Sequence, residues 1–311
     1  MSLNPRRLRI ATRESRLALR QTGMVAAALL ERHPLLEVEI VGMTTRGDQV
    51  LDRPLAQIGG KGLFVKELEV AIDRDRADIA VHSLKDVPMQ IPGQFALATF
   101  GAREDPRDAF VSNRYAALAA LPAGAVVGTS SVRRECQLRR LYPALAFRGL
   151  RGNVITRLAK LDAGDYDAII LAAAGLKRLE LDLRVRATLD ETIPAIGQGI
   201  LAIEYRRDRD DIAQLLEDFE IEATACAARA ERAFGLVVEG SCEVPVGALA
   251  RVDAGAISIE GFIGMPDGTR LVREHAAGKC EDAERLGAEL GAKLLAAGGR
   301  EILRSLASVS A

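Results

Sequence analysis

The sequence has no tryptophan among its 311 residues, and aromatic residues make up only 4% of it. Proteins that bind single-stranded nucleic acids stack the bases on aromatic side chains, and this chain has few to offer. The formal net charge is −1 and the pI is near 6.4, so the chain also lacks the excess of basic residues that binds nucleic acids or anionic membrane surfaces. We therefore expect neither kind of partner.

Cysteine, histidine and long apolar segments are also scarce. The four cysteines, Cys136, Cys226, Cys242 and Cys280, lie far apart, and the chain has only three histidines. This spacing fits neither a disulfide framework nor a metal site. No segment approaches the roughly 20 apolar residues of a membrane span, and no apolar region of a secretory signal follows the basic N-terminus. The sequence predicts a reduced, metal-free protein of the cytoplasm.

A length of 311 residues is enough for two or three domains. Through about residue 205, short apolar runs alternate with amphipathic stretches. The expected strands are Leu8–Ala11, Val38–Met43, Ile79–His82, Phe95–Phe100, Ala109–Ser112, Ala125–Gly128, Ala144–Phe147 and Ala168–Ala173. The expected helices cover 15–32, 64–74, 132–141, 154–163 and 175–180. Alternation of this kind predicts doubly wound α/β domains, in which helices cover both faces of a parallel sheet.

Two segments that combine charge with glycine and proline interrupt this pattern, and we interpret both as crossings between domains. The first is 101–108 (GAREDPRD), and the second is 193–199 (IPAIGQG), which leads into the apolar run 200–205. After about residue 220, a helix, strand-like runs and a long helix indicate an α+β unit. We predict three domains: a discontinuous α/β domain 1 (1–101 and 197–219), an α/β domain 2 (102–196) and a smaller α+β domain 3 (220–311).

Two basic turns, 128–134 (GTSSVRR) and 148–153 (RGLRGN), each follow a predicted strand and open a predicted helix. A helix N-terminus offers unpaired N–H groups, and arginine adds paired donors that match carboxylates and phosphates. Ligands of open α/β sheets bind beyond the carboxyl ends of the strands. The polar residues expected at such ends are Arg13, Ser15, Lys85, Asp86, Ser131, Arg133, Arg134 and Arg151. Their recurrence in both α/β domains predicts a site for an anionic ligand.

Each of these residues also has a simpler explanation. A solvated loop charge or a helix cap accounts for any one of them, and Ser15, Ser130 and Asn153 are each suited to cap a helix. The pair Lys85–Asp86 fits a surface ion pair as well as a cleft carboxylate that stabilises a cation or takes a proton. His82, in an apolar run, is expected to be structural.

Two further segments leave their role open. The segment 59–62 (GGKG) is no Walker A loop, because Leu55 and Gly62 stand where that motif needs glycine and serine or threonine. It suits either a glycine loop that presents Lys61 to a ligand or a plain connector. Cys242 is expected on a loop, where a lone cysteine is more often inert than catalytic, whereas Cys136 and Cys226 are expected in the core.

Taken together, these residues resemble the porphobilinogen deaminase family over nearly the whole chain. The similar motifs are 11–19 (ATRESRLAL), 59–69 (GGKGLFVKELE), 78–88 (DIAVHSLKDVP), 104–110 (EDPRDAF), 128–134, 150–158 (LRGNVITRL), 195–199 (AIGQG) and 240–245 (GSCEVP). The resemblance implies three domains, the first two like the lobes of periplasmic binding proteins, with the catalytic cleft between them. It implies a transferase that joins four porphobilinogen molecules with loss of ammonia and releases hydroxymethylbilane.

The resemblance also implies roles for single residues. It implies a dipyrromethane cofactor, thioether-linked to Cys242, with Asp86 as the catalytic residue. The implied cofactor-binding residues are Cys242, Lys85, Asp86, Thr129, Ser131, Arg133 and Arg134. The implied substrate-binding residues are Arg13, Ser15, Lys61, Arg151 and Arg157. The chain departs from the family at Gln57, where lysine is frequent, and at Ser241, where glycine is frequent. We expect a monomer, and we expect Arg133→Leu or Arg151→Leu to block activity while leaving thermal stability nearly unchanged.

Two other functions remain possible from the sequence. A bilobal binding or sensor protein for a carboxylate ligand explains the arginines without any chemistry. A phosphoryl-transfer enzyme is disfavoured by the broken Walker pattern. Cys242 and Asp86 distinguish the alternatives, because a binding protein needs neither a tethered cofactor nor an acid in its cleft.

Overall fold

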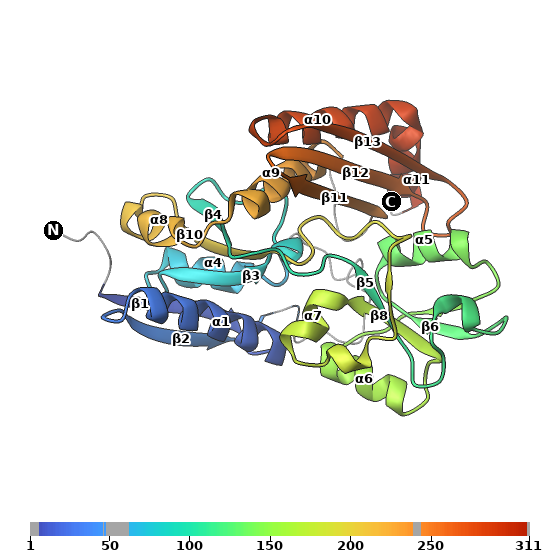
Figure 1. Ribbon diagram of the computed structural model, residues 1–311, viewed down its shortest axis with the longest axis horizontal. Helices are drawn as coiled ribbons and strands as arrows, with labels where there is room; N and C mark the ends of the chain where they lie inside the picture. Colours follow the sequence, from blue (N-terminus) through green and yellow to red (C-terminus); the bar gives the residue numbers. More distant parts are fainter. Residues whose placement is uncertain (1–5, 46, 48–61, 239–243, 310–311) are drawn as a thin grey trace.

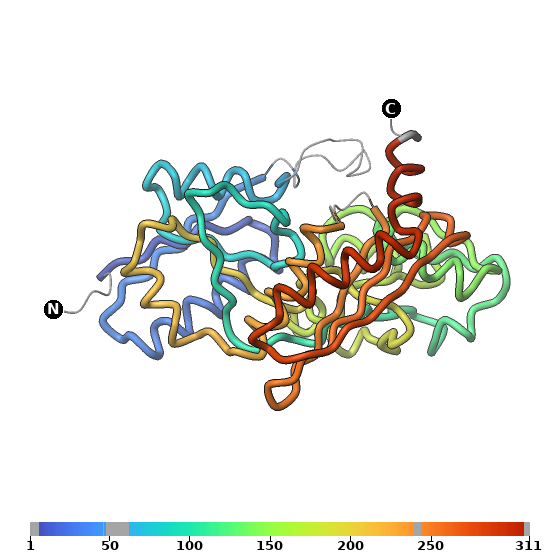
Figure 2. Tube along the Cα trace, turned by 90° about the horizontal axis from the view of Figure 1, so that it is seen from above, coloured from blue at the N-terminus to red at the C-terminus, as the bar shows by residue number. Residues whose placement is uncertain are grey.

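The computed structural model describes residues 6–45, 47, 62–238 and 244–309, which form three domains (Figure 1). Two of them, here called lobe 1 and lobe 2, are each built on a five-stranded sheet, and domain 3 is built on a three-stranded sheet. Domain 3, orange and red in Figure 2, contacts both lobes. Its helix α9 (Glu222–Val237) contacts β4 (Phe95–Phe100) of lobe 1, and its strand β12 (Ala256–Gly264) contacts α5 (Val132–Leu141) of lobe 2. None of the helices in these ranges is both long and apolar enough to span a membrane.

Lobe 1 has the strand order β2-β1-β3-β10-β4. Its strands are β1 (Arg7–Arg13), β2 (Glu37–Met43), β3 (Ile79–Ser83), β4 (Phe95–Phe100) and β10 (Leu201–Arg206). Its helices are α1 (Arg16–Arg32), α4 (Lys66–Asp73) and α8 (Asp210–Glu217). Alternate residues of the strands and one face of α1 form the core, in which Leu8, Leu29 and Ile203 are fully buried. Burial of this apolar surface is the main term that holds the helices on the sheet.

Lobe 2 has the strand order β7-β6-β8-β5-β9. Its strands are β5 (Asp108–Val111), β6 (Val126–Gly128), β7 (Ala146–Arg148), β8 (Ala168–Ala172) and β9 (Ala187–Leu189). Its helices are α5 (Val132–Leu141), α6 (Val154–Asp162) and α7 (Ala173–Arg178). Helices on both sides of this sheet cover its apolar strands, as the alternation in the sequence predicts.

The prediction of wholly parallel sheets is wrong for one strand in each lobe. In lobe 1, β10 runs antiparallel to β3 and β4, with Ala202 opposite His82. In lobe 2, β5 runs antiparallel to β8 and β9. Both strands directly follow a crossing between the lobes. A chain that arrives from the other lobe needs no helical crossover to reach its place, so the constraint that makes neighbouring strands parallel does not apply to it.

Domain 3 is the expected α+β unit. Its strands are β11 (Val246–Asp253), β12 (Ala256–Gly264) and β13 (Leu271–Lys279), all antiparallel. Its helices are α9 (Glu222–Val237), α10 (Ala283–Leu294) and α11 (Arg300–Val309). Helices α9 and α10 approach closely at Gly287, where a Cβ would lie 2.0 Å from the carbonyl oxygen of Ala230. Only glycine permits this contact between the two backbones.

Both crossings between the lobes are tied to the same buried carboxylate of domain 3. Arg103 of the first crossing donates from Nη1 to Oε1 of Glu231 at 2.6 Å. The amide of Gly197, in the second crossing, donates to Oε2 of Glu231 at 2.6 Å. The chain thus passes from one lobe to the other at the two predicted crossings. The exact domain limits, 1–101 with 197–219, 102–196 and 220–311, stay predictions.

Candidate functional site

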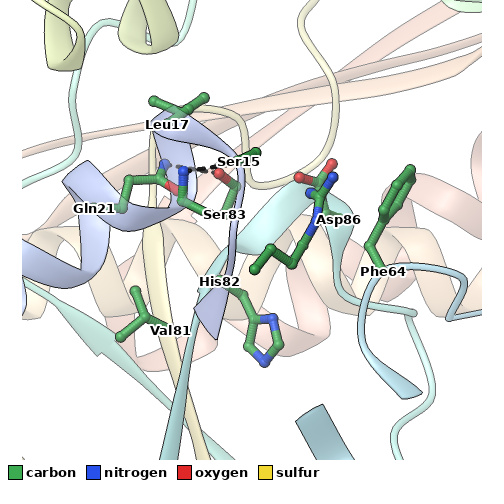
Figure 3. Close-up of a pocket in the computed structure, with 10 residues that line it drawn as sticks. Ser15, Leu17, Gln21, Phe64, Val81, His82, Ser83 and Asp86 are labelled. Atoms are coloured by element: carbon green, nitrogen blue, oxygen red, sulfur yellow. Dashed lines mark hydrogen bonds between the residues drawn. The ribbon is translucent and has the colours of Figure 1, made fainter. Parts of the chain in front are cut away.

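A hollow at the carboxyl end of β1 and β3 brings together several of the residues predicted from lobe 1. Arg13, Ser15, Phe64, Ser83 and Asp86 line it (Figure 3). The Arg13 guanidinium carbon lies 4.2 Å from the centroid of the Phe64 ring, a cation–π contact that orients the cation. The hollow therefore combines a cation, a hydroxyl and a carboxylate on one face of lobe 1.

Asp86 reaches this hollow because β3 ends in a short 3₁₀ turn, Leu84–Asp86. The side chain of Leu84 is buried at 2% exposure and anchors the turn, whereas Asp86 is exposed to solvent. One residue of the turn thus points into the core and another stands at the rim of the hollow. His82, on the same strand, is buried, lies 3.0 Å from Oε2 of Glu204 and also lines the hollow, so its structural role stays a prediction.

The serine caps agree with the sequence in part. Ser15 caps α1 by accepting from the amide of Ala18, and Asn153 caps α6, as predicted. The prediction is wrong for Ser130, since Ser131 is the residue that caps α5. The Ser130 hydroxyl instead bonds the backbone of Leu150, 2.8 Å from its oxygen and 2.9 Å from its nitrogen. That hydroxyl holds the two basic turns of lobe 2 against each other.

The arginines of the first basic turn are buried and have an internal partner. Arg133 donates from Nη2 to both oxygens of Asp108, at 3.0 and 2.8 Å. Arg134 donates from Nε to Oδ1 of the same carboxylate at 2.9 Å. Burial alone would raise the pKa of Asp108, but the two guanidinium groups outweigh it and hold that pKa well below its usual range. Asp108 is a residue that the sequence reasoning missed.

This pairing changes what we expect of the arginines. Arg133 also donates to the carbonyl of Ile193, and Arg134 to that of Ile170, so each guanidinium already holds structure together. Removal of one partner of a buried ion pair destabilises a protein strongly. The expectation that Arg133→Leu leaves thermal stability unchanged therefore does not suit a side chain in this position. Ligand binding by Arg133 and Arg134 stays a prediction. It would use the guanidinium N–H groups that do not bond Asp108 or the two carbonyls.

Lys85 joins this cluster from lobe 1. Its Nζ donates to Oε1 of Gln198 at 3.3 Å, so its hydrogen-bond partner is a neutral amide and not the carboxylate of Asp86 that a surface ion pair would use. The pKa of Lys85 is lowered to about 8, mainly by burial; the positive charges of Arg134 and Arg133 act in the same direction, and Asp86 and Asp108 oppose them. The ammonium group thus sits between the carboxylate at the rim and the buried cluster of lobe 2.

The second basic turn lies close enough to the Lys85 cluster to interact with it electrostatically. Arg157 donates from Nε to the carbonyl of Gly152 at 2.7 Å. The pKa of Arg157 is lowered to about 10, mainly by burial; Arg134 and Arg151 act in the same direction, and Asp86 opposes them. Arg157 of lobe 2 therefore interacts electrostatically with Asp86 of lobe 1. Thr129 is buried beside them, and its hydroxyl accepts from the amide of Ser131.

The structure brings residues of both lobes to one site in which cations outnumber carboxylates. Lys61, Cys242, Gln57 and Ser241 lie outside the described residues, so their predicted roles are not tested by it. Cys136 and Cys226 are buried, as predicted. In the described ranges, no group of three histidine, cysteine, aspartate or glutamate side chains is placed to hold a metal ion.

An exposed carboxylate among cations from two α/β lobes is an arrangement that suits an enzyme or a binding protein for an anionic ligand. Two family models resolve this choice. The model described as "Porphobilinogen deaminase, dipyromethane cofactor binding domain" matches residues 8–214, and "Porphobilinogen deaminase, C-terminal domain" matches residues 225–296. The chain belongs to the porphobilinogen deaminase family.

Two relatives that are more than half identical to this chain support the same assignment. The porphobilinogen deaminase of Nitrosomonas europaea is 52% identical over 306 residues, which cover 98% of this chain and 99% of the relative. That of Thiobacillus denitrificans is 55% identical over 301 residues, covering 96% and 98%. Among solved structures, a nutrient binding protein from Burkholderia cenocepacia bound to methionine aligns with 68% of this chain and 91% of its own, at 13% identity and a TM-score of 0.43.

Proposed function

We propose that this chain is the hydroxymethylbilane synthase of tetrapyrrole biosynthesis. It is a transferase that joins porphobilinogen molecules head to tail on a covalently bound dipyrromethane, with loss of ammonia at each step, and hydrolysis releases hydroxymethylbilane. The observation that supports this most directly is the position of Asp86, an exposed carboxylate that interacts with Lys85 of its own lobe and Arg157 of lobe 2. Membership of the family supports the substrate and the cofactor.

The residues of the site fit a dipyrromethane by the chemistry of their donors. Each pyrrole ring of the cofactor carries an acetate and a propionate, so the group needs several cations and hydroxyl donors. Lys85, Arg133 and Arg134 provide the cations, and Thr129 and Ser131 provide hydroxyl groups. Cys242, outside the described residues, would hold the cofactor through a thioether. When bound, the cofactor supplies the pyrrole α-carbon to which the first substrate is joined.

The chain's own residues then act on the incoming porphobilinogen. Arg13, Arg151, Arg157 and Lys61 hold its carboxylates, and Ser15 donates a hydroxyl hydrogen bond. The C–N bond of the substrate breaks and ammonia leaves, so positive charge develops on the ring. Asp86 stabilises this charge and accepts from the pyrrole N–H, because a fixed carboxylate near a developing cation lowers the barrier. Formation of the C–C bond releases the α-hydrogen as a proton, which ammonia takes up.

Intact-protein mass after expression in a porphobilinogen-producing cell tests the function. We expect the wild-type protein to carry added mass and to give a pyrrole colour with an aldehyde reagent, whereas Cys242→Ser shows the bare polypeptide mass and no colour. A wild-type protein at bare mass that does not consume porphobilinogen would contradict the proposal, and it would favour the alternative of a carboxylate-binding protein.

The role of Asp86 has its own test. Asp86→Asn keeps the shape but removes the charge, so we expect turnover to fall on the order of a hundredfold or more with the cofactor still loaded. Asp86→Glu keeps the charge but moves it by about a methylene, so part of the activity should remain. Turnover of the Asn variant at the wild-type rate would show that another group stabilises the cation.

We further propose that the protein acts as a monomer in the cytoplasm, with no nucleic-acid or membrane partner. The near-neutral net charge of −1 supports this, since it gives no general attraction to either surface. Light scattering on a sizing column should give one species near the chain mass of 33.4 kDa. A concentration-dependent species of twice that mass would contradict the monomer.

A further inference from the structure

Gln198 is a buried polar residue of the site to which none of the steps above gives a role. It is 1% exposed and lies in the second crossing between Gly197 and Gly199, whose φ angles are 73° and 91°. A Cβ on Gly197 would lie 2.7 Å from Cγ of Leu84, and one on Gly199 would lie 2.3 Å from the carbonyl oxygen of Glu104. The backbone at Gln198 is therefore pressed between the turn that carries Asp86 and the first crossing.

The amide of Gln198 joins groups from both lobes. Its Nε2 donates to the carbonyl of Pro106 at 2.7 Å and to Oδ1 of Asp108 at 2.9 Å. Its Oε1 accepts from Nζ of Lys85 at 3.3 Å. Two acceptors on one side and a donor on the other are satisfied by only one orientation of the amide. They also require a neutral group that donates at one end and accepts at the other.

We propose that Gln198 is a positioning residue for the reaction, whose amide fixes the Lys85 ammonium of lobe 1 against the Asp108–Arg133–Arg134 cluster of lobe 2. Lys85 precedes Asp86 in the same turn, so this link sets where the catalytic carboxylate stands relative to the arginines of the other lobe. The inference rests on the proposed function. It also explains why an amide stands at this point of the second crossing. A carboxylate there would face the Asp108 carboxylate and the carbonyl of Pro106 without a hydrogen to donate to either.

Lys85 itself can report on the link. The charged groups around it are Asp86 on its own turn, Asp108 on β5, and Arg133 and Arg134 on α5. The amide oxygen of Gln198 stabilises the charged form of Lys85, because it accepts a hydrogen bond from the ammonium group. Loss of this oxygen makes the ammonium easier to deprotonate. A carboxylate in the same place makes it harder.

Two variants separate these effects. Gln198→Met keeps the volume but removes every hydrogen bond, and Gln198→Glu places a negative charge beside Lys85, kept ionised by Arg133 and Arg134. Competitive acetylation with acetic anhydride across pH, read by the mass of the Lys85 peptide, gives the titration midpoint of Lys85. Relative to the wild-type midpoint, we expect that of Lys85 to be about one pH unit lower in Q198M and about one unit higher in Q198E.

Turnover should fall in both variants while the cofactor stays loaded. We expect kcat to drop on the order of tenfold to a hundredfold, with a smaller change in KM, because the substrate carboxylates still meet their arginines but Asp86 is misplaced. A merely structural role would lower stability in both variants without moving the Lys85 midpoint in opposite directions.

Gln137→Met is the matched control. Gln137 is another buried glutamine of this region, but its amide bonds the backbone of Ile193, at 3.1 Å from the oxygen and 2.8 Å from the nitrogen. This variant should lose stability like Q198M yet keep the wild-type Lys85 midpoint. Wild-type kcat in Q198M, or equal midpoints in Q198M and Q198E, would overturn the inference. A wild-type protein without cofactor or turnover would instead overturn the proposed function, and the Lys85 midpoints would still show whether the link exists.

Discussion

Asp108 in lobe 2 and Glu204 in lobe 1 are both fully buried carboxylates, but the protein surrounds them in opposite ways. Asp108 accepts from two guanidinium groups and from the amide of Gln198. Glu204 bonds His82 through Oε2, and its Oε1 has no donor in the part of the chain that the structure describes. Burial destabilises an ionised carboxylate, and in lobe 2 two guanidinium groups hydrogen-bonded to Asp108 offset that cost.

Glu69 of α4 supplies the missing donor of lobe 1 when it is protonated. Burial and the negative charge of Glu204 raise the pKa of Glu69 to about 7, so near neutral pH it carries a proton part of the time. A protonated Glu69 donates a hydrogen bond to Glu204, and an ionised one repels it. The Asp108 carboxylate of lobe 2 therefore stays ionised near neutral pH, whereas the charge of Glu69 in lobe 1 changes there.

Asp108→Ala should have the largest effect on stability. It leaves Arg133 and Arg134 buried without their carboxylate, so we expect the free energy of unfolding to fall by about 3–5 kcal/mol in urea denaturation. Asp190→Ala is the control, because the Asp190 side chain is 76% exposed and pairs with Arg107 at the surface. That variant should change stability by no more than about 1 kcal/mol. Equal losses in the two variants would show that the buried cluster is not what stabilises lobe 2.

Glu69→Gln should alter how stability depends on pH. The pKa of Glu69 rises from an ordinary value of 4.5 to about 7 on folding, so between these pH values the native state binds more protons than the unfolded state. The contribution of Glu69 to the wild-type free energy of unfolding should therefore be largest below pH 4.5 and be lost as the pH rises through 7. Urea titrations at several pH values should show a smaller fall in the variant.

In Glu69→Gln, the glutamine donates to Glu204 at every pH. The pH dependence of stability that Glu69 contributes is therefore absent from this variant. Glu284→Gln, at an exposed position of α10, is the control and should keep the wild-type slope. A variant of Glu69 with the wild-type pH dependence would show that the two carboxylates of lobe 1 do not share a proton.

Ser15→Ala and Ser131→Ala should have the smallest effects and should be alike. Each hydroxyl accepts from a backbone amide at 3.4 Å, at the first turn of α1 and of α5. Loss of such a cap costs about 1 kcal/mol. Thermal unfolding of the two variants, with Ser→Thr at both positions as the conservative control, measures the cost. A markedly larger loss in lobe 2 would mean that Ser131 also maintains the arginine cluster.

The elements of the fold were largely predictable because local pattern determines them. The helix 132–141 was predicted at the bounds of α5, although Ser131 and not the predicted Ser130 caps it. The directions of β5 and β10 were not predictable, because an apolar run does not show which strand it will pair with or in which direction. The three-residue β9 and the charged helix α8 gave no periodic signal long enough to detect.

The positions of the candidate site residues at strand ends were predictable but their charge pairs were not, and their roles in binding and catalysis stay predictions. Strand ends located Arg13, Asp86 and Arg133, because ligand sites of α/β sheets form there. Asp108 lies 25 residues from Arg133 and 90 from Gln198, and no local pattern links positions so far apart. One signal was available: Asp108 opens the apolar run of β5, and an acid in such a place requires a buried partner.

The position of β10 between β3 and β4 has a consequence for biosynthesis. A ribosome makes residues 108–189, with every strand of lobe 2, before it makes residues 201–206. Lobe 2 can fold as soon as it emerges, whereas the sheet of lobe 1 must wait with the edges of β3 and β4 open to pairing. The first lobe to be synthesised is therefore the last of the two to be finished, and the nascent chain carries its aggregation-prone edges for that interval.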